Sequence, residues 1–161
     1  MIRDAKLCDA AALTDIYNYY ILNTVVTFEE QPITALEMSN RITEVTDAEL
    51  PWLVAEQNRM IVGFAYASKW KGRCAYRYSA EVTIYLSHSM TSNGIGSALY
   101  SELFLRLRAN SIHVVLGGIS LPNDASIALH EKFGMSKAAH FDEVGFKFGN
   151  WVDVAYWQGK L

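Results

Sequence analysis

A short glycine-containing loop between a strand-like and a helix-like segment is the feature that most constrains this chain. Alternating apolar residues lead up to Leu86, and a helical apolar stripe runs from about Gly94 to Arg108. Glycines let the backbone approach a ligand closely, and the first amides of a helix are unpaired and carry partial positive charge. The loop between the two segments therefore predicts an anion site suited to a pyrophosphate. It contains Ser92-Asn93-Gly94-Ile95-Gly96-Ser97.

Two better-known nucleotide-binding motifs do not match this loop. The phosphate-binding loop of nucleotide hydrolases requires Gly-Lys-Ser/Thr, and the chain has no such string. The dinucleotide fingerprint requires a small residue where Leu99 stands, and an acidic residue about 20 positions further on that this chain lacks. The alternative is purely structural, with Gly94 and Gly96 shaping a tight turn.

The remaining chain alternates helix-like and strand-like segments. Helical spacing predicts helices over 9–22, 34–45 and 124–133, the second opened by a capping box of Thr34 and Glu37. Alternation predicts strands near Ile2, over 51–56, 61–69, 76–86 and 113–119, and two more around Gly149-Asn150. The order β-α-α-β-β-β-α-β-α-β-β indicates an α/β (α+β) fold, with a mixed, mostly antiparallel central sheet flanked by helices.

Length and composition indicate one domain over residues 1–161. The 161 residues are 51% hydrophobic and 19% charged, an ordinary globular balance. Cys8 and Cys74 form no Cys-x-x-Cys pair, so we expect reduced thiols. We find no signal-peptide core and no apolar run of about 20 residues. We therefore expect a soluble, cytoplasmic protein that does not enter a membrane.

Charge and histidine spacing argue against two further classes of protein. The net charge is −3, and no Lys/Arg cluster is longer than the scattered group of Lys69, Lys71 and Arg73, so we expect no nucleic acid as the main partner. The four histidines show no metal-binding spacing, so we expect no metal site. Cys74 has no neighbouring histidine in the sequence, which leaves nucleophilic catalysis without specific support.

The glycine loop is part of a longer pattern. Leu86 to Leu99 resembles the acetyl-CoA loop of the GNAT acetyltransferase superfamily, whose consensus is Arg/Gln-x-x-Gly-x-Gly/Ala. Asn123 to Met135 resembles its second signature, Asn-x-x-Ala/Ser-x-x-Leu-Tyr/His-x-x-x-Gly-Phe. The consensus Arg/Gln falls on Thr91 here, so pyrophosphate binding would depend on backbone amides and hydroxyls.

Four further strings resemble one branch of this superfamily, the phosphinothricin and methionine sulfoximine N-acetyltransferases. They are Thr27–Pro32, Pro51–Glu56, Ala75–Glu81 and Gly145–Val154. The resemblance spans nearly the whole chain and implies the GNAT fold, a homodimer and acetyl-CoA as co-substrate. It also implies direct transfer of the acetyl group to the amine of a small amino-acid-like acceptor, such as phosphinothricin, methionine sulfoximine or methionine sulfone.

The same resemblance implies catalytic residues. Glu81 matches the catalytic Glu of the family and would act as general base, provided that its pKa is raised or a water relays the proton. The alternative is a structural ion pair of Glu81 with Arg73 or Arg77. His130 takes the Tyr position of the second signature and would protonate the leaving thiolate; a structural histidine is the alternative.

Binding residues follow from the resemblance as well. Those expected to hold acetyl-CoA are Ile84, Tyr85 and Leu86 for the acyl and pantetheine arm, Ser92, Asn93, Gly94, Ile95, Gly96 and Ser97 for the pyrophosphate, and Asn123 for the arm. Those expected to line the acceptor pocket are Lys71, Gly72, Arg73, Glu81, Val82, Thr83 and Phe28. The alternatives are a helix N-cap for Asn123, a solvated loop for 71–73 and a core position for Phe28.

Two other functions stay open at this point. A protein or peptide N-terminal acetyltransferase would use the same chemistry on an open groove, whose shape the sequence does not give. A non-catalytic acetyl-CoA-binding module is the second, because Thr91 departs from the consensus.

Overall fold

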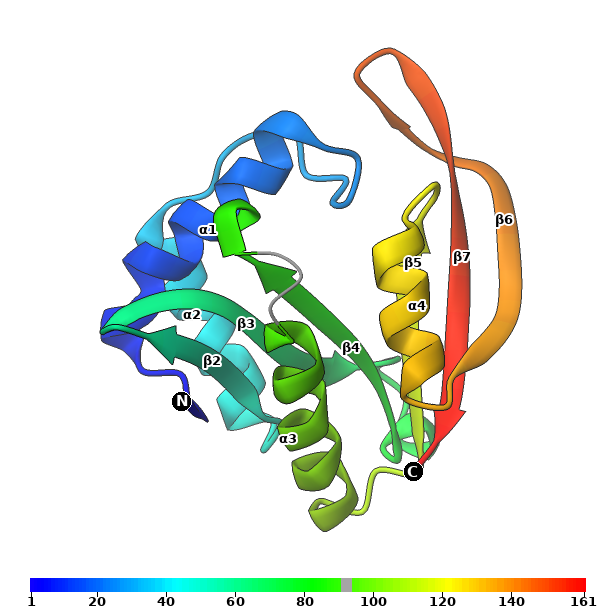
Figure 1. Cartoon of the computed structure of the whole chain (residues 1–161). Helices are drawn as coiled ribbons and strands as arrows, with labels where there is room; N and C mark the ends of the chain where they lie inside the picture. Colours follow the sequence, from blue (N-terminus) through cyan, green and yellow to red (C-terminus); the bar gives the residue numbers. More distant parts are fainter. Residues whose placement is uncertain (91–93) are drawn as a thin grey trace.

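A seven-stranded sheet forms the centre of the protein in the computed structural model, which describes residues 1–90 and 94–161 (Figure 1). The strands are β1 (Ile2–Asp4), β2 (Trp52–Gln57), β3 (Met60–Lys69), β4 (Ser79–Leu86), β5 (Val114–Ser120), β6 (Ser136–Lys147) and β7 (Asn150–Lys160). The helices are α1 (Ala10–Asn23), α2 (Ala35–Asp47), α3 (Ile95–Ala109) and α4 (Asp124–Lys132), with short 3-10 turns at Leu7–Asp9, Cys74–Tyr76 and His88–Met90.

The strand order is β1-β2-β3-β4-β5-β7-β6, and β4 with β5 is the parallel pair among antiparallel neighbours. This confirms the predicted order of elements and the mixed, mostly antiparallel sheet. The parallel pair arises because α3 carries the chain back across the sheet between β4 and β5, whereas hairpins join β2 to β3 and β6 to β7.

The two parallel strands separate after a short common stretch. Their ladder covers only Ser79–Glu81 and Val114–Leu116, although β4 continues to Leu86 and β5 to Ser120. Figure 1 shows the far end of β4 leaning toward α1 while β5 continues alongside β7 and α4. A gap therefore opens in the middle of the sheet, beside the start of α3.

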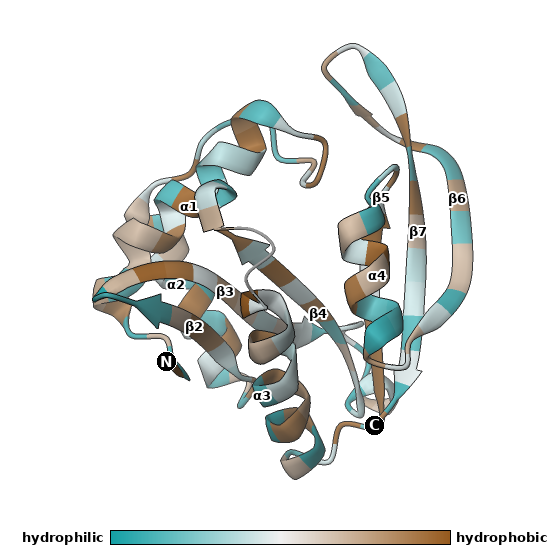
Figure 2. Ribbon diagram, in the orientation of Figure 1, coloured by the Kyte–Doolittle hydropathy of each residue, from teal (hydrophilic) through white to brown (hydrophobic). Residues whose placement is uncertain are grey.

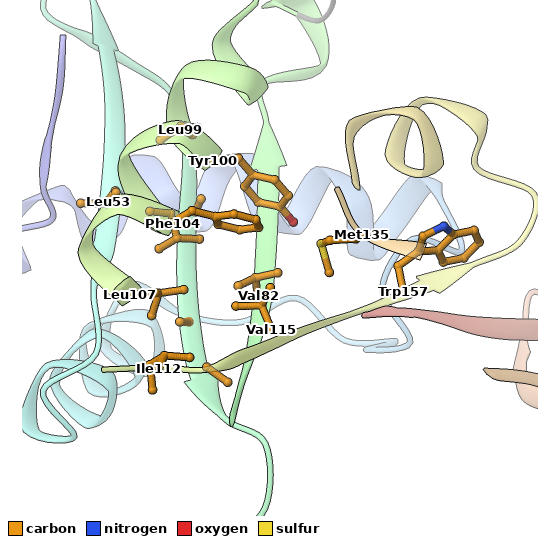
Figure 3. Close-up of a cluster of buried hydrophobic side chains, with 14 of the residues drawn as sticks. Leu53, Val82, Leu99, Tyr100, Phe104, Leu107, Ile112, Val115, Met135 and Trp157 are labelled. Carbon is orange, nitrogen blue, oxygen red and sulfur yellow. The ribbon is translucent and has the colours of Figure 1, made fainter. Parts of the chain in front are cut away.

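Hydrophobic clusters lie on both faces of the sheet. On one face, α3 packs its apolar side onto small and branched residues of the strands, as Figure 3 shows around Tyr100, Phe104 and Leu107. On the other face, α1 and α2 cover an aromatic cluster with Trp52, Phe64 and Tyr85. Because successive strand residues point to opposite faces, Val82 belongs to the α3 side and Tyr85 to the α1 side.

The hydropathy pattern agrees with this layering. Figure 2 shows apolar colour along much of β3, alternating apolar and polar bands along β4, and mixed colour along β6 at the edge of the sheet. No helix within residues 1–90 and 94–161 is both long and apolar enough to cross a membrane.

Short-range signals set the ends of several elements. The predicted capping box is present: Glu37 N donates to Thr34 Oγ1 at 3.2 Å, and Thr34 N donates to Glu37 Oε2 at 2.6 Å. The two hairpins turn through residues of positive φ, Asn58 and Arg59 in one and Phe148 and Gly149 in the other. The second turn lies one residue earlier than the expected Gly149-Asn150, because Asn150 already pairs with Lys147.

One strand boundary differs from the sequence-based expectation. The strand expected over 76–86 begins at Ser79, and Cys74–Tyr76 forms a 3-10 turn. The amide of Tyr76 donates to Arg73 O at 3.0 Å and that of Arg77 donates to Cys74 O at 3.1 Å. These local hydrogen bonds occupy the amides that a sheet ladder would need, so strand pairing starts only after them.

A buried lysine connects the C-terminal hairpin to the loop between α1 and α2. Lys147 on β6 is 1% exposed, and its Nζ donates to the carbonyl oxygen of Thr27 at 2.8 Å. Burial lowers the pKa of this ammonium, while the charges of Glu29 and Glu30 oppose that shift. The contact joins two segments that lie far apart in the sequence.

Candidate active site

A groove of about 400 Å³ lies between the N-terminus of α3, the end of β4 and α4. Every described residue of the expected acetyl-CoA set lines it: Ile84, Tyr85, Leu86, Gly94, Ile95, Gly96, Ser97 and Asn123. Ser92 and Asn93, together with Thr91, lie outside the described residues. The structure thus brings together residues that the sequence places in three separate segments.

The mouth of the groove suits an anionic ligand. Gly94 caps α3 in the left-handed conformation with φ 74°, and α3 begins with amides that have no partner in a preceding turn. A Cβ added to Gly96 would lie 3.4 Å from Leu129 Cδ2 and 3.6 Å from Ile84 Cδ1. A side chain there would occupy the groove, so glycine keeps the backbone open to a ligand at the positive end of the helix dipole.

A cation that the sequence did not suggest lies beside this mouth. Lys132, the last residue of α4, donates from Nζ to Ser97 Oγ at 2.9 Å. The spacing of 35 residues between the two gives no local signal. This ammonium places positive charge next to the loop, in which Thr91 replaces the consensus basic or amide residue.

A narrow slot of about 50 Å³ lies at the inner end of the groove. The groove and the slot share the lining residues Val26, Ile84, Tyr85, Asn123 and Ser126. Thr83 and Ser120 belong to the slot alone. An extended ligand whose anionic end lies at α3 would therefore have its other end between the two separating strands.

Glu81 lies on β4 at the last rung of the ladder with β5, opposite Leu116. The carboxyl is half-buried, and burial raises its pKa, while the nearby Tyr156 hydroxyl and the charge of Lys71 act in the opposite direction. Among the described residues Glu81 has no ion pair, which removes support for the structural alternative with Arg73 or Arg77. A half-buried carboxyl with a raised pKa is a better proton acceptor than an exposed glutamate.

His130 is buried on the opposite side of β5, and both of its ring nitrogens have partners inside the protein. Its Nδ1 lies 2.7 Å from the carbonyl oxygen of Ser126, and its Nε2 lies 3.1 Å from the hydroxyl of Tyr100. A carbonyl can only accept, so Nδ1 carries the proton and Nε2 accepts from Tyr100. Burial also lowers the pKa of the imidazole. The geometry therefore favours a neutral, internally bonded histidine over a proton donor to the slot.

The imidazole of His130 fits against β5 only because of a glycine. A Cβ added to Gly117 would lie 2.3 Å from His130 Nε2, closer than any real contact allows. The ring consequently packs directly on the strand backbone, and its position is fixed by α3, α4 and β5 together.

The residues expected to line the acceptor pocket do not all lie around one cavity. Thr83 lines the slot on the same strand face as Glu81, whereas Val82 is buried toward α3 and reaches the slot only from that side. Lys71, Gly72 and Arg73 line a separate cavity of about 600 Å³ near the start of β4.

Of the loop residues 71–73, Lys71 is the one whose charge reaches Glu81. Its Nζ lies 4.8 Å from the centre of the Trp70 ring, and that ring packs edge-on against Tyr156 at 5.4 Å. Phe28 lies elsewhere, with its ring against Gly145 of β6, where an added Cβ would come within 2.3 Å of it. Lys71 and Tyr156 thus form one side of the carboxyl's surroundings, and Tyr156 was not suggested by the sequence.

Three side chains of the C-terminal hairpin bring potential metal ligand atoms within 4.8 Å of one another: His140, Asp142 and Asp153. His140 and Asp153 already have hydrogen-bond partners. Lys137 Nζ lies 2.9 Å from His140 Nδ1, so His140 Nε2 carries the ring proton and donates to Asp153 Oδ2 at 2.9 Å. The other oxygen of Asp153 accepts from the amide of Glu143 at 2.8 Å. Internal hydrogen bonds account for these two side chains, and Asp142 Oδ1 lies 3.4 Å from His140 Nε2.

Comparison with known proteins agrees with the geometry of the groove. A family model described as an acetyltransferase (GNAT) domain matches residues 2–156. The phosphinothricin N-acetyltransferase of Streptomyces viridochromogenes is 40% identical over 157 residues, which is 98% of this chain and 85% of that protein. The L-methionine sulfoximine/L-methionine sulfone acetyltransferase of Salmonella typhimurium is 33% identical over 99% of this chain and 94% of its own length.

A solved structure gives the same result. The GNAT superfamily phosphinothricin acetyltransferase from Sinorhizobium meliloti, in complex with acetyl-CoA, superposes with a TM-score of 0.97 and 38% identity, covering 100% of this chain and 88% of that one. The chain belongs to the GNAT acetyltransferase family. It is an acetyltransferase with acetyl-CoA as its co-substrate.

Proposed function

We propose that this enzyme acetylates the amino group of a small amino-acid-like acceptor of the phosphinothricin, methionine sulfoximine or methionine sulfone type. The observation that carries this is that the groove at the α3 N-terminus shares lining residues with the slot, where Thr83 lies on the same face of β4 as Glu81. The names of the relatives support the acceptor class. Residues 1–161 act as one catalytic domain in this proposal.

The groove residues have separate tasks in the proposed reaction. The loop from Ser92 to Ser97 holds the pyrophosphate through backbone amides and hydroxyls, and Lys132 adds charge beside it. The β4 segment Ile84–Leu86 lies along the acyl and pantetheine arm. Asn123 caps α4 by accepting from Ser126 N at 3.1 Å, which leaves its side-chain amide NH₂ group able to bind the arm. When bound, acetyl-CoA supplies the activated acyl group.

Glu81 is the general base in this proposal. Its raised pKa lets it accept a proton from the acceptor amine, directly or through a water. Lys71, whose charge acts on this carboxyl, would attract the carboxylate of an amino acid, and Thr83 lines the slot. Gly72, Arg73 and Phe28 remain candidates for the acceptor pocket at greater separation from the slot, and Val82 remains a candidate that lines the slot from the α3 side.

A homodimer is the second part of the proposal. The C-terminal hairpin exposes large apolar side chains: Phe141, Val144, Phe146, Phe148 and Trp151. Such a concentration of exposed apolar surface supports association with a second copy. Light scattering of the wild-type protein and of Phe146→Lys would test it; a monomeric wild-type protein would contradict the proposal.

We also propose that the enzyme works in the cytoplasm. Both cysteines, Cys8 and Cys74, are free and exposed, which supports a reducing compartment. Fractionation of cells that express the chain at its natural level would test this proposal.

The decisive experiment is thiol release from acetyl-CoA across a panel of amines. The panel contains phosphinothricin, methionine sulfoximine, methionine sulfone, ordinary amino acids and a peptide with a free N-terminus. We expect release with the amino-acid analogues and loss of most of it in Glu81→Gln. Release with the peptide alone would instead indicate a peptide acetyltransferase. No release with any amine, despite measurable acetyl-CoA binding, would indicate a binding module.

A further inference from the structure

Ser120, the last residue of β5, carries a hydroxyl group that the protein itself leaves unused. The residue is 7% exposed and lines the slot between the separating strands. Across the described part of the chain, Ser120 Oγ finds no hydrogen-bond partner. Burying a hydroxyl without a partner costs free energy, so a group of this kind in a cavity is available to hydrogen-bond a bound ligand.

The register of the sheet shows where this hydroxyl lies. Glu81 and Leu116 form the last rung between β4 and β5, and four residues further along each strand stand Tyr85 and Ser120. Alternation places Ser120 on the same face of β5 as Leu116, the face that Glu81 shares. The next residue on that face, Gly118, packs under the ring of Tyr156. Ser120 therefore flanks the inner end of the groove on the side of the proposed base.

His130, which the sequence suggested as the proton donor, has no free proton for a ligand in the slot. The Nδ1 proton of His130 is directed at the carbonyl of Ser126, and the hydroxyl of Tyr100 donates to His130 Nε2. A leaving thiolate would thus meet no donor from this pair. Ser120, across the slot, has a free hydroxyl proton.

We propose that the Ser120 hydroxyl donates a hydrogen bond to the sulfur of the acyl donor and stabilises the thiolate as it leaves. In the transfer step the amine nitrogen forms the new C–N bond, the C–S bond breaks and its electron pair goes to sulfur. The amine proton goes to Glu81, directly or through water, and Ser120 keeps its own proton throughout. The hydrogen bond strengthens as negative charge builds on sulfur.

The position of Ser120 at the inner end favours the sulfur over other parts of the donor. The pyrophosphate site lies at α3, at the opposite end of the groove, so the thioester end of an extended donor reaches the slot. The expected effect of Ser120 on the reaction rate rests on the proposed transfer reaction. Its expected effect on the thiol of bound CoA does not depend on any acceptor amine.

The test compares wild-type protein with Ser120→Ala, loaded with CoA alone. The ultraviolet absorbance of the thiolate, followed against pH, gives the pKa of the bound thiol. Losing a donor to a charged group should raise that pKa by about one to two units. The exposed Ser101→Ala on α3 serves as the matched control and should leave it unchanged. An unaltered thiol pKa in Ser120→Ala would overturn the proposal.

Two further measurements separate this role from a structural one. Removing an unpaired buried hydroxyl should not lower the melting temperature, so Ser120→Ala is expected to fold normally. Its kcat should fall about tenfold, while the Kd of acetyl-CoA, by calorimetry, should change less than about threefold, because a thioester sulfur is a weak acceptor before charge develops. Equal losses for CoA and acetyl-CoA, with an unchanged thiol pKa, would assign the hydroxyl to ground-state binding and overturn the proposal.

Failure of the Ser120 proposal can be distinguished from failure of the proposed function. A wild-type protein that acetylates no amine, yet shows the shift in thiol pKa between wild type and Ser120→Ala, would refute the proposed acceptor chemistry and support the Ser120–sulfur contact.

Discussion

The Nε2 atom of His130 lies 3.1 Å from the hydroxyl oxygen of Tyr100, and both side chains are buried where α3, α4 and β5 meet. Burial lowers the pKa of the imidazole. The unfolded chain therefore binds more protons than the folded one once the pH falls below about 6.5, the ordinary pKa of histidine. The contribution of the neutral imidazole to stability is full above that pH and is lost as the pH drops toward the lowered pKa of the folded state.

The first prediction follows from this loss of stability as the pH falls. The melting temperature of the wild-type protein should fall between pH 7.5 and pH 5, about 2–4 °C for each kcal/mol lost in a chain of this length. His130→Gln should lower the melting temperature at pH 7.5 but flatten its dependence on pH. The exposed His113→Gln, as control, should retain the wild-type slope. Equal slopes in all three proteins would contradict the assignment of a neutral His130.

The second prediction concerns the base. Glu81→Gln should reduce kcat by about a hundredfold to ten-thousandfold, because a positioned general base contributes that much. The Kd of acetyl-CoA, measured by calorimetry, should stay within twofold of wild type, since the carboxyl lies beyond the groove. A normal turnover in this variant would remove Glu81 from the mechanism.

The third prediction concerns the pH dependence of the reaction. A base acts only when it is deprotonated, so the rate should fall as the pH is lowered through the pKa of Glu81, and burial moves that fall to a higher pH than for an exposed glutamate. Lys71 lowers the pKa of this carboxyl, so Lys71→Met should move the acid limb of the kcat profile to higher pH. A limb that stays in place, or moves to lower pH, would show that Lys71 does not act on Glu81.

The fourth prediction tests the cation at the mouth of the groove. Lys132→Ala should weaken acetyl-CoA binding by about two- to fivefold, as expected for an exposed charge, and leave kcat unchanged. The difference should shrink at high salt, because salt screens exposed charges. Lys160→Ala removes a similarly exposed lysine at the end of β7 and should have no effect. Equal binding by the Lys132 and Lys160 variants would argue against a role for Lys132.

The fifth prediction is that one substitution, Gly96→Ala, raises the stability of the protein and weakens acetyl-CoA binding. Gly96→Ala places a methyl group at ordinary contact distance from Leu129 and Ile84, so the free protein can accommodate it. Alanine in a helix is favoured over glycine by about 0.5–1 kcal/mol, so the melting temperature should rise slightly. The same methyl group narrows the groove and should weaken acetyl-CoA binding by about tenfold. Unchanged binding would mean that the co-substrate does not pass along Gly96.

Much of the fold follows from signals that act over a few residues. Three of these signals depend on neighbours in sequence: the capping box of Thr34 and Glu37, the glycine before α3 and the positive-φ turn after Lys147. The sequence predicts the first two and places the third within one residue. The strand expected from residue 76 is shorter because a local 3-10 turn at Cys74–Tyr76 competes with sheet pairing, and the apolar pattern alone does not separate the two.

The candidate site likewise contains residues that local sequence signals predict and contacts that they do not predict. The groove residues from Ile84 to Ser97 flank one strand–loop–helix unit, and Asn123 joins them through a recognisable signature. Three other features depend on how distant segments pack. They are the hydrogen bond between Tyr100 and His130, the hydrogen bond from Lys132 to Ser97 and the unpaired hydroxyl of Ser120. No periodicity or motif carries that information, so only the structure supplies these relationships.

The buried contact between Lys147 and Thr27 gives the groove a support that its own residues do not provide. Thr27 follows Val26, which lines both the groove and the slot, so a wall of the groove is held by a hairpin 120 residues further along the chain. That hairpin also carries the apolar surface on which two copies would meet. Thermodynamic linkage then sets a condition: if association changes the affinity for acetyl-CoA by some factor, acetyl-CoA changes the affinity between the two copies by the same factor.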